Sequence, residues 1–344
     1  MKMKGIAIAI MLACCLSFSQ GVCSAENDAL VELGRSLFSA TSLSRDGKTS
    51  CQTCHSPLNA YADTRPTSVG VDNGRGTRNA PSLVDISDYT AFFWDGRRSR
   101  LEDVVIDPFT NPVELGLAST DDLLARLRNE NALQRDLELA FPDAEKRPTL
   151  KQVSQALTSF VRSLRMTAST AQTTMAATPS AKIRLGRALF EGVAGCNECH
   201  TTEGNPPRYS DGLYHHSGVD ASLPTAQLPE TARTIIQQSL PIEALGPKIL
   251  TDANWSVLGR FVVTQRPADL GSFRTPSLRN VALTSPYMHD GSIATLAEAV
   301  DHELFYRGFA RGHPLNLSRP ERAALVAFLE TLTEVEPVAT RLFP

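Results

Sequence analysis

Apolar residues recur at three- and four-residue spacing along much of this chain, which is the pattern of amphipathic helices. The longer stretches with this spacing are residues 121–140, 150–165, 294–306 and 319–333. Two shorter ones, ELGRSLF (32–38) and RLGRALF (184–190), are nearly the same sequence, which indicates that one structural unit occurs twice. Strict apolar–polar alternation is rare, and residues 56–82 and 201–230 carry the scattered Gly, Pro, Asn and Asp of loops. The pattern predicts a mainly α-helical fold.

An uncharged segment separates the two repeats. Its sequence, MTASTAQTTMAATPS (166–180), is rich in Thr, Ala and Ser, which is typical of a connector. The chain has 344 residues, enough for two domains of ordinary size. We therefore expect one domain at 26–165 and a second at 181–344.

The chain begins with the features of a secretory signal peptide. MKMK is followed by the apolar run GIAIAIMLACCL and then by the small-residue site CSA, which ends at residue 25. The alternative, a membrane anchor, is disfavoured because the apolar run is too short to span a bilayer. We expect residues 1–25 to be removed, leaving a periplasmic protein without stable membrane insertion.

All cysteines outside this leader belong to two short motifs. The chain has seven cysteines, and three of them (Cys14, Cys15 and Cys23) lie in the leader. The other four occur in SCQTCHSPLN (50–59) and GCNECHTTEG (195–204). A redox-active thiol pair would need a βαβ context, which the sequence lacks, whereas one zinc shared by four thiolates remains an alternative.

The histidine that follows each cysteine pair favours haem. In C-x-x-C-H, two thiols one helical turn apart can bond both vinyl groups of one porphyrin, and the next imidazole can reach the iron. The sequence therefore predicts two covalent c-type haems in two cytochrome c-like domains. The first is held by Cys51, Cys54 and His55, and the second by Cys196, Cys199 and His200.

The distribution of strong haem ligands differs between the two halves. No histidine lies between His55 and His200, and no methionine lies between residues 26 and 165, so the first half offers only weak candidates such as Tyr61 and Tyr89. The second half carries Met288, His289 and His302. We expect the first haem to be open or water-ligated and the second to be six-coordinate, which suggests chemistry at one haem and electron transfer at the other.

An open haem that cleaves peroxide needs a nearby acid–base group. Glu114 in DPFTNPVELG (107–116) is the candidate, because its Pro, Val and Leu neighbours would hold its pKa near the useful range. The alternative is a surface glutamate in a turn. The net charge of −3 and the scattered Lys and Arg give no sign of nucleic-acid binding.

The order of motifs resembles the bacterial dihaem cytochrome c peroxidase / MauG family over nearly the whole chain. Besides the two C-x-x-C-H motifs, the similar segments are RGTRNAPSL (75–83), FFWDGR (92–97), NPVELG (111–116) and FRTPSLRNVALTSPYMHDGS (273–292). The resemblance implies an N-terminal peroxidatic haem, a C-terminal electron-transfer haem and an active site between two cytochrome c-like domains. It implies that Glu114 is catalytic and that Trp94 lies between the haems. It also implies a calcium ion held by Asn79, Thr284 and Pro286, since calcium prefers oxygen ligands.

Two departures from the family pattern refine this expectation. The peroxidases carry a displaceable histidine in the segment that here reads TSVGVDNG (67–74), where Val71 stands instead, so the chain is closer to MauG-like members. At the position of the family's sixth ligand to the second haem stands Glu303. We predict His302 as that ligand, with Tyr306 and then Met288 as alternatives. A surface role for His302 also remains open.

Three functions fit these features. The first is a periplasmic peroxidase that reduces H2O2 with electrons from a small cytochrome c or cupredoxin. The second is a MauG-like oxidase that withdraws electrons from a residue of a protein substrate through Trp94. The third is a non-enzymatic electron-transfer or gas-sensing cytochrome, against which Glu114 and Trp94 both argue. The missing gating histidine favours the second over the first.

Overall fold

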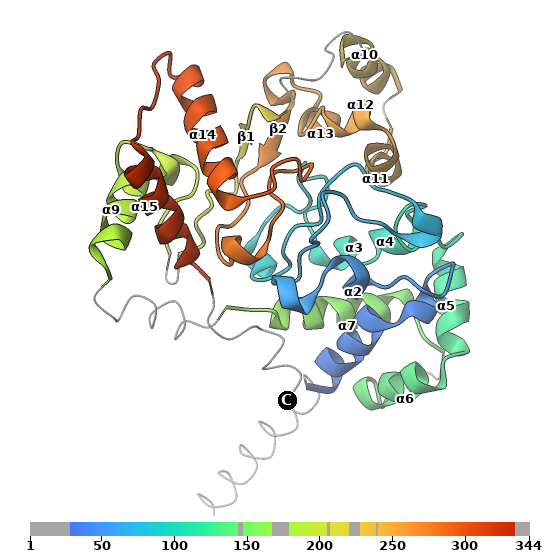
Figure 1. Ribbon diagram of the computed structural model, residues 1–344. Coiled ribbons are helices and arrows are strands. Elements are labelled where there is room, and N and C mark those ends of the chain that lie inside the picture. Colours follow the sequence, from blue (N-terminus) through green and yellow to red (C-terminus); the bar gives the residue numbers. More distant parts are fainter. Residues whose placement is uncertain are drawn as a thin grey trace, which may run out of the picture.

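The computed structural model describes residues 28–143, 147–166, 179–204, 207–219, 228–238 and 240–333. The predicted signal peptide and connector residues 167–178 lie outside the described residues. We call 28–166 the N-terminal half and 179–333 the C-terminal half. The expectation of a mainly helical fold is confirmed (Figure 1).

Helices of one to four turns, joined by long irregular segments, make up both halves. The N-terminal half is helical at 28–39 and then contains α2 (Cys51–Cys54), α3 (Leu101–Val104), α4 (Asp107–Thr110), α5 (Thr120–Arg128), α6 (Asn131–Ala140) and α7 (Leu150–Ser163). Its short 3-10 turns are η1 (Thr41–Leu43), η2 (Pro57–Asn59), η3 (Val71–Asn73) and η4 (Ile86–Asp88).

The C-terminal half adds a small antiparallel sheet to its helices. Its helices are α9 (Ala181–Glu191), α10 (Leu228–Gln238), α11 (Ile242–Thr251), α12 (Ala253–Ser256), α13 (Phe261–Thr264), α14 (Leu296–Ala310) and α15 (Arg319–Glu330). Its 3-10 turns are η5 (Cys196–Glu198), η8 (Pro267–Asp269) and η9 (Val281–Leu283). Strands β1 (Tyr214–His216) and β2 (Ser272–Arg274) pair with His215 opposite Phe273.

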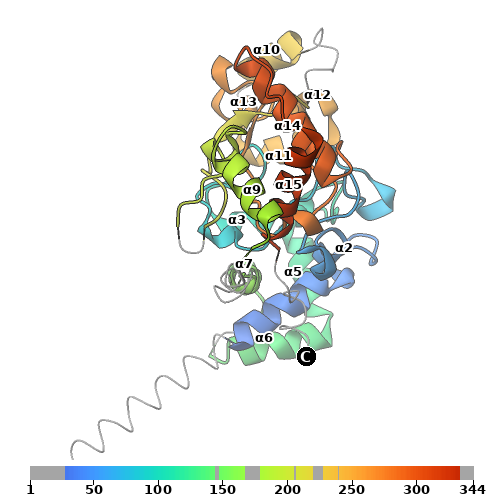
Figure 2. The same ribbon diagram turned by 60° about the vertical axis from the view of Figure 1, so that its left-hand side comes forward.

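The repeated sequences form the same helix crossing in both halves. Helix 28–39 crosses α7 at Gly34, and α9 crosses α15 at Gly186; the second pair lies side by side in both views (Figure 1; Figure 2). A Cβ atom built on Gly34 would overlap the carbonyl oxygen of Ala156, and one on Gly186 would overlap that of Ala324. Glycine therefore allows the two backbones of each pair to approach closely.

Three aromatic rings pack together beside each helix crossing. The clusters consist of Phe38, Tyr61 and Phe160 in the N-terminal half and Phe190, Tyr209 and Phe328 in the C-terminal half. The two phenylalanine rings lie 5.1 Å apart between centroids in the first cluster and 5.2 Å in the second. Both distances are within the range of favourable aromatic pairs.

Replacing either crossing glycine with alanine should destabilise the protein. We expect Gly34→Ala and Gly186→Ala each to lower the free energy of unfolding by about 1–3 kcal/mol or more, because the added methyl group meets backbone that cannot move freely. Gly76→Ala is the matched control, since a Cβ there meets no atom within 4 Å. Denaturant unfolding of the three haem-loaded variants measures the effect. Equal stability of all three would show that the crossings are loosely packed.

Long periodic stretches produced the predicted helices, with one difference. The stretch 121–140 forms two helices, α5 and α6, rather than one. Glu130 has extended backbone angles and breaks the helix after Asn129. Asn is a weak helix former because its side chain competes for backbone hydrogen bonds, which explains a break at this point.

Helices α10 to α13 form an insert that the periodicity did not predict. The insert has its own buried cluster, which consists of Ile235, Leu245, Ile249, Trp255, Leu258, Phe261 and Val262. It is attached to the N-terminal half: Thr77 Oγ1 donates to the Ile249 carbonyl oxygen at 2.6 Å. Arg78 donates to the Ser256 carbonyl oxygen at 2.7 Å and pairs with buried Asp95 at 2.5 Å. The two halves are therefore joined by buried polar contacts.

The larger buried clusters lie on either side of the predicted connector. One runs from Leu33 to Met166 and the other from Leu189 to Leu332. Within the described ranges, no helix combines the length and the apolar character needed to cross a bilayer.

Candidate haem and catalytic site

The two C-x-x-C-H motifs have similar local geometry. Cys51 and Cys54 begin and end the single turn of α2, whereas Cys196 begins the 3-10 turn η5 and Cys199 directly follows it. In both motifs the following histidine donates its backbone N–H to the carbonyl oxygen of the first cysteine, at 2.9 Å. Each turn thus places two thiols and an imidazole on one short segment.

Both motif histidines are oriented to bind a metal through Nε2. The Nδ1 atom of His55 lies 2.8 Å from the Tyr61 carbonyl oxygen, and that of His200 lies 2.9 Å from the Tyr209 carbonyl oxygen. A carbonyl oxygen can only accept, so Nδ1 carries the proton and Nε2 keeps its lone pair. Burial lowers the pKa of His55 and lowers that of His200 to about 4, which keeps both rings neutral. These are the properties of axial haem ligands.

The cysteine environments disfavour the shared zinc site. Burial raises the pKa of Cys51 to about 12, and the charges of Cys54 and Glu114 add to this effect. Burial likewise raises the pKa of Cys54 to about 11 and that of Cys196 to about 11. Cys51 packs against the buried cluster of the N-terminal half and Cys196 against that of the C-terminal half, so the two cysteine pairs belong to separate cores rather than to one four-thiolate site.

A cavity of about 640 Å³ adjoins the second motif. Cys196, Cys199 and His200 line it together with apolar side chains such as Leu304 and Leu329. A mostly apolar cavity of this size with an imidazole in its wall fits a porphyrin.

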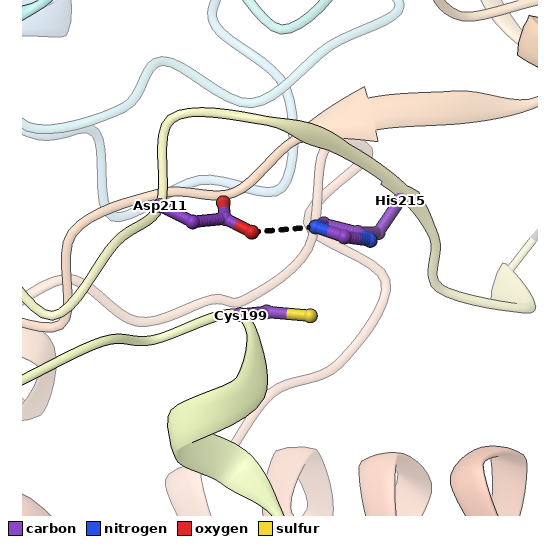
Figure 3. Close-up of side chains that lie close together, drawn as sticks. All are labelled: Cys199, Asp211 and His215. Atoms are coloured by element: carbon purple, nitrogen blue, oxygen red, sulfur yellow. Dashed lines mark hydrogen bonds and ion pairs between the residues drawn. The ribbon is translucent and has the colours of Figure 1, made fainter.

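One group of possible metal ligands lies at this cavity, and two of its members, Cys199 and His215, line it. Among the described residues, only Cys199, Asp211 and His215 bring three such ligand atoms together, all within 4.8 Å of one another. Figure 3 shows the His215 ring pointing at the Asp211 carboxylate, with Cys199 beside them; Nε2 and Oδ2 are 2.7 Å apart. Because Cys199 belongs to the second motif, we assign this group to the wall of the haem site rather than to a separate ion.

Glu114 lies beside the first motif. Its carbonyl oxygen accepts from the backbone N–H of Val71 at 3.0 Å, which packs the segment around Val71 against it. The side chain is half-buried, and its charge contributes to the raised pKa values of Cys51 and Cys54. Burial raises the pKa of Glu114 to about 7, while the Arg97 charge opposes this shift. A carboxyl group with this pKa can both accept and return a proton near neutral pH.

Trp94 lies where the two halves meet. Its indole Nε1 donates to the Asn79 carbonyl oxygen at 2.9 Å, and its own carbonyl oxygen accepts from the Arg274 backbone N–H at 2.8 Å. Its ring stands edge-on to buried His289, with 6.5 Å between centroids. Trp94 also lines the cavity that contains His200. It therefore contacts both halves and borders the second haem site.

The three calcium candidates border the same cavity. Asn79, Thr284 and Pro286 all line it. The Asn79 side-chain nitrogen donates to the carbonyl oxygens of Arg65 and Pro66 at 3.2 and 3.3 Å, so the amide oxygen is the atom available to a cation. All three border this one cavity, and calcium binding stays a prediction.

The candidates for the sixth ligand of the second haem lie in different places. His302 Nε2 is 2.7 Å from the Ser217 carbonyl oxygen, and His302 does not line the cavity. Tyr306, Met288 and Glu303 do line it. Sequence reasoning gave no role to Arg307, which lines the cavity and lies 3.2 Å from the Cys199 sulfur.

Comparisons with known proteins decide the family. The profile of the Di-haem cytochrome c peroxidase family matches residues 28–178. A cytochrome-c peroxidase, IdrP2 of Denitromonas iodatirespirans, is 32% identical over 319 residues, which cover 90% of this chain and 83% of that protein. The chain belongs to the dihaem cytochrome c peroxidase family. Membership implies two c-type haems and the activity of a dihaem peroxidase-type oxidoreductase.

This dihaem peroxidase is also similar to MauG proteins. The methylamine utilization protein MauG of Methylorubrum extorquens is 31% identical over 322 residues, covering 91% of this chain and 80% of that protein. A solved structure of a MauG-like protein associated with microbial copper homeostasis superposes with a TM-score of 0.71 at 27% identity, covering 92% of each chain.

Proposed function

We propose that this dihaem peroxidase is an exported, periplasmic MauG-like oxidoreductase. It uses H2O2 at an open first haem and draws the electrons through the second haem. The alternative, a non-enzymatic electron-transfer or gas-sensing cytochrome, is not favoured, because the family relatives are peroxidases and MauG proteins.

The observation that carries the proposal is the Val71–Glu114 contact. The segment that would carry a displaceable histidine carries Val71, whose side chain is 1% exposed. Its backbone is hydrogen-bonded to Glu114, next to the first motif. An aliphatic side chain cannot ligate iron, so this position leaves the distal side open while Glu114 supplies a proton acceptor.

The side chains divide the work on peroxide. The haem, when bound, supplies an iron that can pass electrons to the oxygen–oxygen bond. Glu114 accepts the proton of one peroxide oxygen and returns it to the other, which leaves as water. Reduction of H2O2 to two waters takes two electrons and two further protons. Trp94 offers an oxidisable indole between the halves for the passage of these electrons.

Two kinds of reductant fit the site. A small cytochrome c or cupredoxin would make the protein a peroxide-reducing enzyme, whereas a residue of a protein substrate would make it a protein-modifying oxidase. The open first haem and the likeness to MauG proteins support the second. We also propose that calcium at Asn79, Thr284 and Pro286 stiffens the region around Trp94, because the Asn79 carbonyl holds the indole.

The resting state of the first haem tests the proposal. In the ferric protein as isolated, we expect one high-spin haem by electron paramagnetic resonance and a rapid reaction with H2O2 without prior reduction. Val71→His should introduce a ligand, convert this haem to low spin and suppress the reaction until partial reduction. Val71→Ala is the control and should keep the haem high-spin. Two low-spin haems at rest in the unaltered protein would contradict an open site.

A further inference from the structure

Helix α14 presents two adjacent rows of side chains to different neighbours. His302 and Tyr306 form the first row, and their rings are parallel to within 4°. His302 Nε2 contacts the Ser217 carbonyl oxygen, and a Cβ built on Gly218 would overlap the Tyr306 ring. This row therefore packs against residues 217–218, where Tyr306 and Ser217 also border the cavity but His302 does not.

The second row faces the second haem motif. Its members are Glu303 and Arg307, whose carboxylate and guanidinium are 3.6 Å apart. Arg307 also donates to the Gly195 carbonyl oxygen at 3.1 Å and contacts the Cys199 sulfur at 3.2 Å. Both side chains line the cavity that contains Cys196 and His200.

Glu303 is the member of this row whose side chain has an atom that can ligate iron. Arg307 is held by four neighbours, namely Glu303, Glu198, Gly195 and Cys199. A guanidinium cannot ligate a metal because it has no lone pair to give. The Glu303 carboxylate has two oxygens, so one can remain with Arg307 while the other faces the cavity. Burial raises the pKa of Cys196 to about 11, and the negative charge of Glu303 also raises it. The carboxylate therefore lies within electrostatic reach of the motif.

We propose that Glu303, positioned by Arg307, is the distal oxygen ligand of the second haem in place of His302. The proposal rests on the haem attachment stated above and names a further residue of that site. An anionic oxygen donor stabilises ferric over ferrous iron, whereas a methionine does the reverse. A carboxylate here would make the second haem a ready electron donor toward Trp94.

Spectra and reduction potentials of the purified two-haem variants test the assignment. Glu303→Gln should change the ligand-sensitive absorption and paramagnetic signals of the second haem, and Glu303→Met should give a low-spin haem with a higher reduction potential. Arg307→Gln should lower that potential, because it removes a cation next to the site. His302→Gln should leave the signals of the second haem as they are, because His302 does not line the cavity.

The opposite pattern would overturn the assignment. A second haem that is altered by His302→Gln or Tyr306→Phe, and unaltered by Glu303→Gln, would return the ligand to the first row. Haem content and the peroxide reaction of the first haem are recorded on the same samples. If the unaltered protein lacks two haems or does not react with peroxide at the first haem, the proposed function is contradicted. A change in the variants that is confined to the second haem reports only on Glu303.

Discussion

Replacing Glu114 with Gln lowers peroxide turnover by about 10²-fold or more while both haems stay attached. Gln keeps the shape and hydrogen-bonding span of the side chain, but its amide cannot accept the peroxide proton. Steady-state consumption of H2O2 by the purified variant measures the loss. Glu138→Gln, on the exposed side of α6, is a matched control and should turn over as the unaltered protein does. Full activity in Glu114→Gln would leave Glu114 as a turn residue.

The pH dependence gives this prediction a second readout. The carboxyl group must be ionised before it can take a proton from H2O2. Because burial raises the pKa of Glu114 to about 7, the rate of peroxide reaction should rise as the pH increases through 7 and then level off. Glu114→Gln should show a flat profile over this range. A profile that falls with rising pH would mean that Glu114 acts in its protonated form.

Trp94→Phe should separate the two haems kinetically. Phenylalanine fills much of the same space but is far harder to oxidise and loses the hydrogen bond to the Asn79 carbonyl oxygen. We expect a folded protein with two haems in which peroxide oxidises the first haem, while the second stays ferric or responds slowly. Stopped-flow absorption at the bands of both haems follows each step.

The second tryptophan supplies the control for this experiment. Trp255 is 6% exposed in the core of the helical insert, so Trp255→Phe should cost a similar amount of stability without changing communication between the haems. If the second haem of Trp94→Phe is oxidised as fast as in the unaltered protein, the relay role is wrong. Trp94 then serves only to pack the two halves together.

The sequence predicted those parts of the molecule that local patterns determine. Regular helices such as α7 and α15 have clear apolar periodicity, and the two crossings carry nearly identical sequence around Gly34 and Gly186. Helices α12 and α13 have four residues each, which is too short for a periodic pattern, and α11 contains Pro247, a residue that normally ends a helix. These features explain why α11 to α13 were not predicted, whereas α10, with eleven residues, begins inside the segment 201–230 that was predicted to be a loop.

The sequence predicted only those site residues whose roles follow from their spacing along the chain. Cys51, Cys54 and His55 are neighbours in sequence, so their roles follow from one turn of chain. His302 and Glu303 are also neighbours, yet they face different surroundings, because the rotation of α14 depends on packing against residues 217–218. Contacts between distant segments cannot be read from spacing, and these contacts separate the two candidates.

The repeated glycine crossing bears on the origin of the molecule. Each half closes its own helix pair with a glycine and its own aromatic cluster, as expected if an ancestral gene for one cytochrome was duplicated and fused. The insert has its own buried cluster in the C-terminal half, and Trp94 is hydrogen-bonded where the two halves meet. Selection could thus build a new activity at the junction while each inherited module kept its own core.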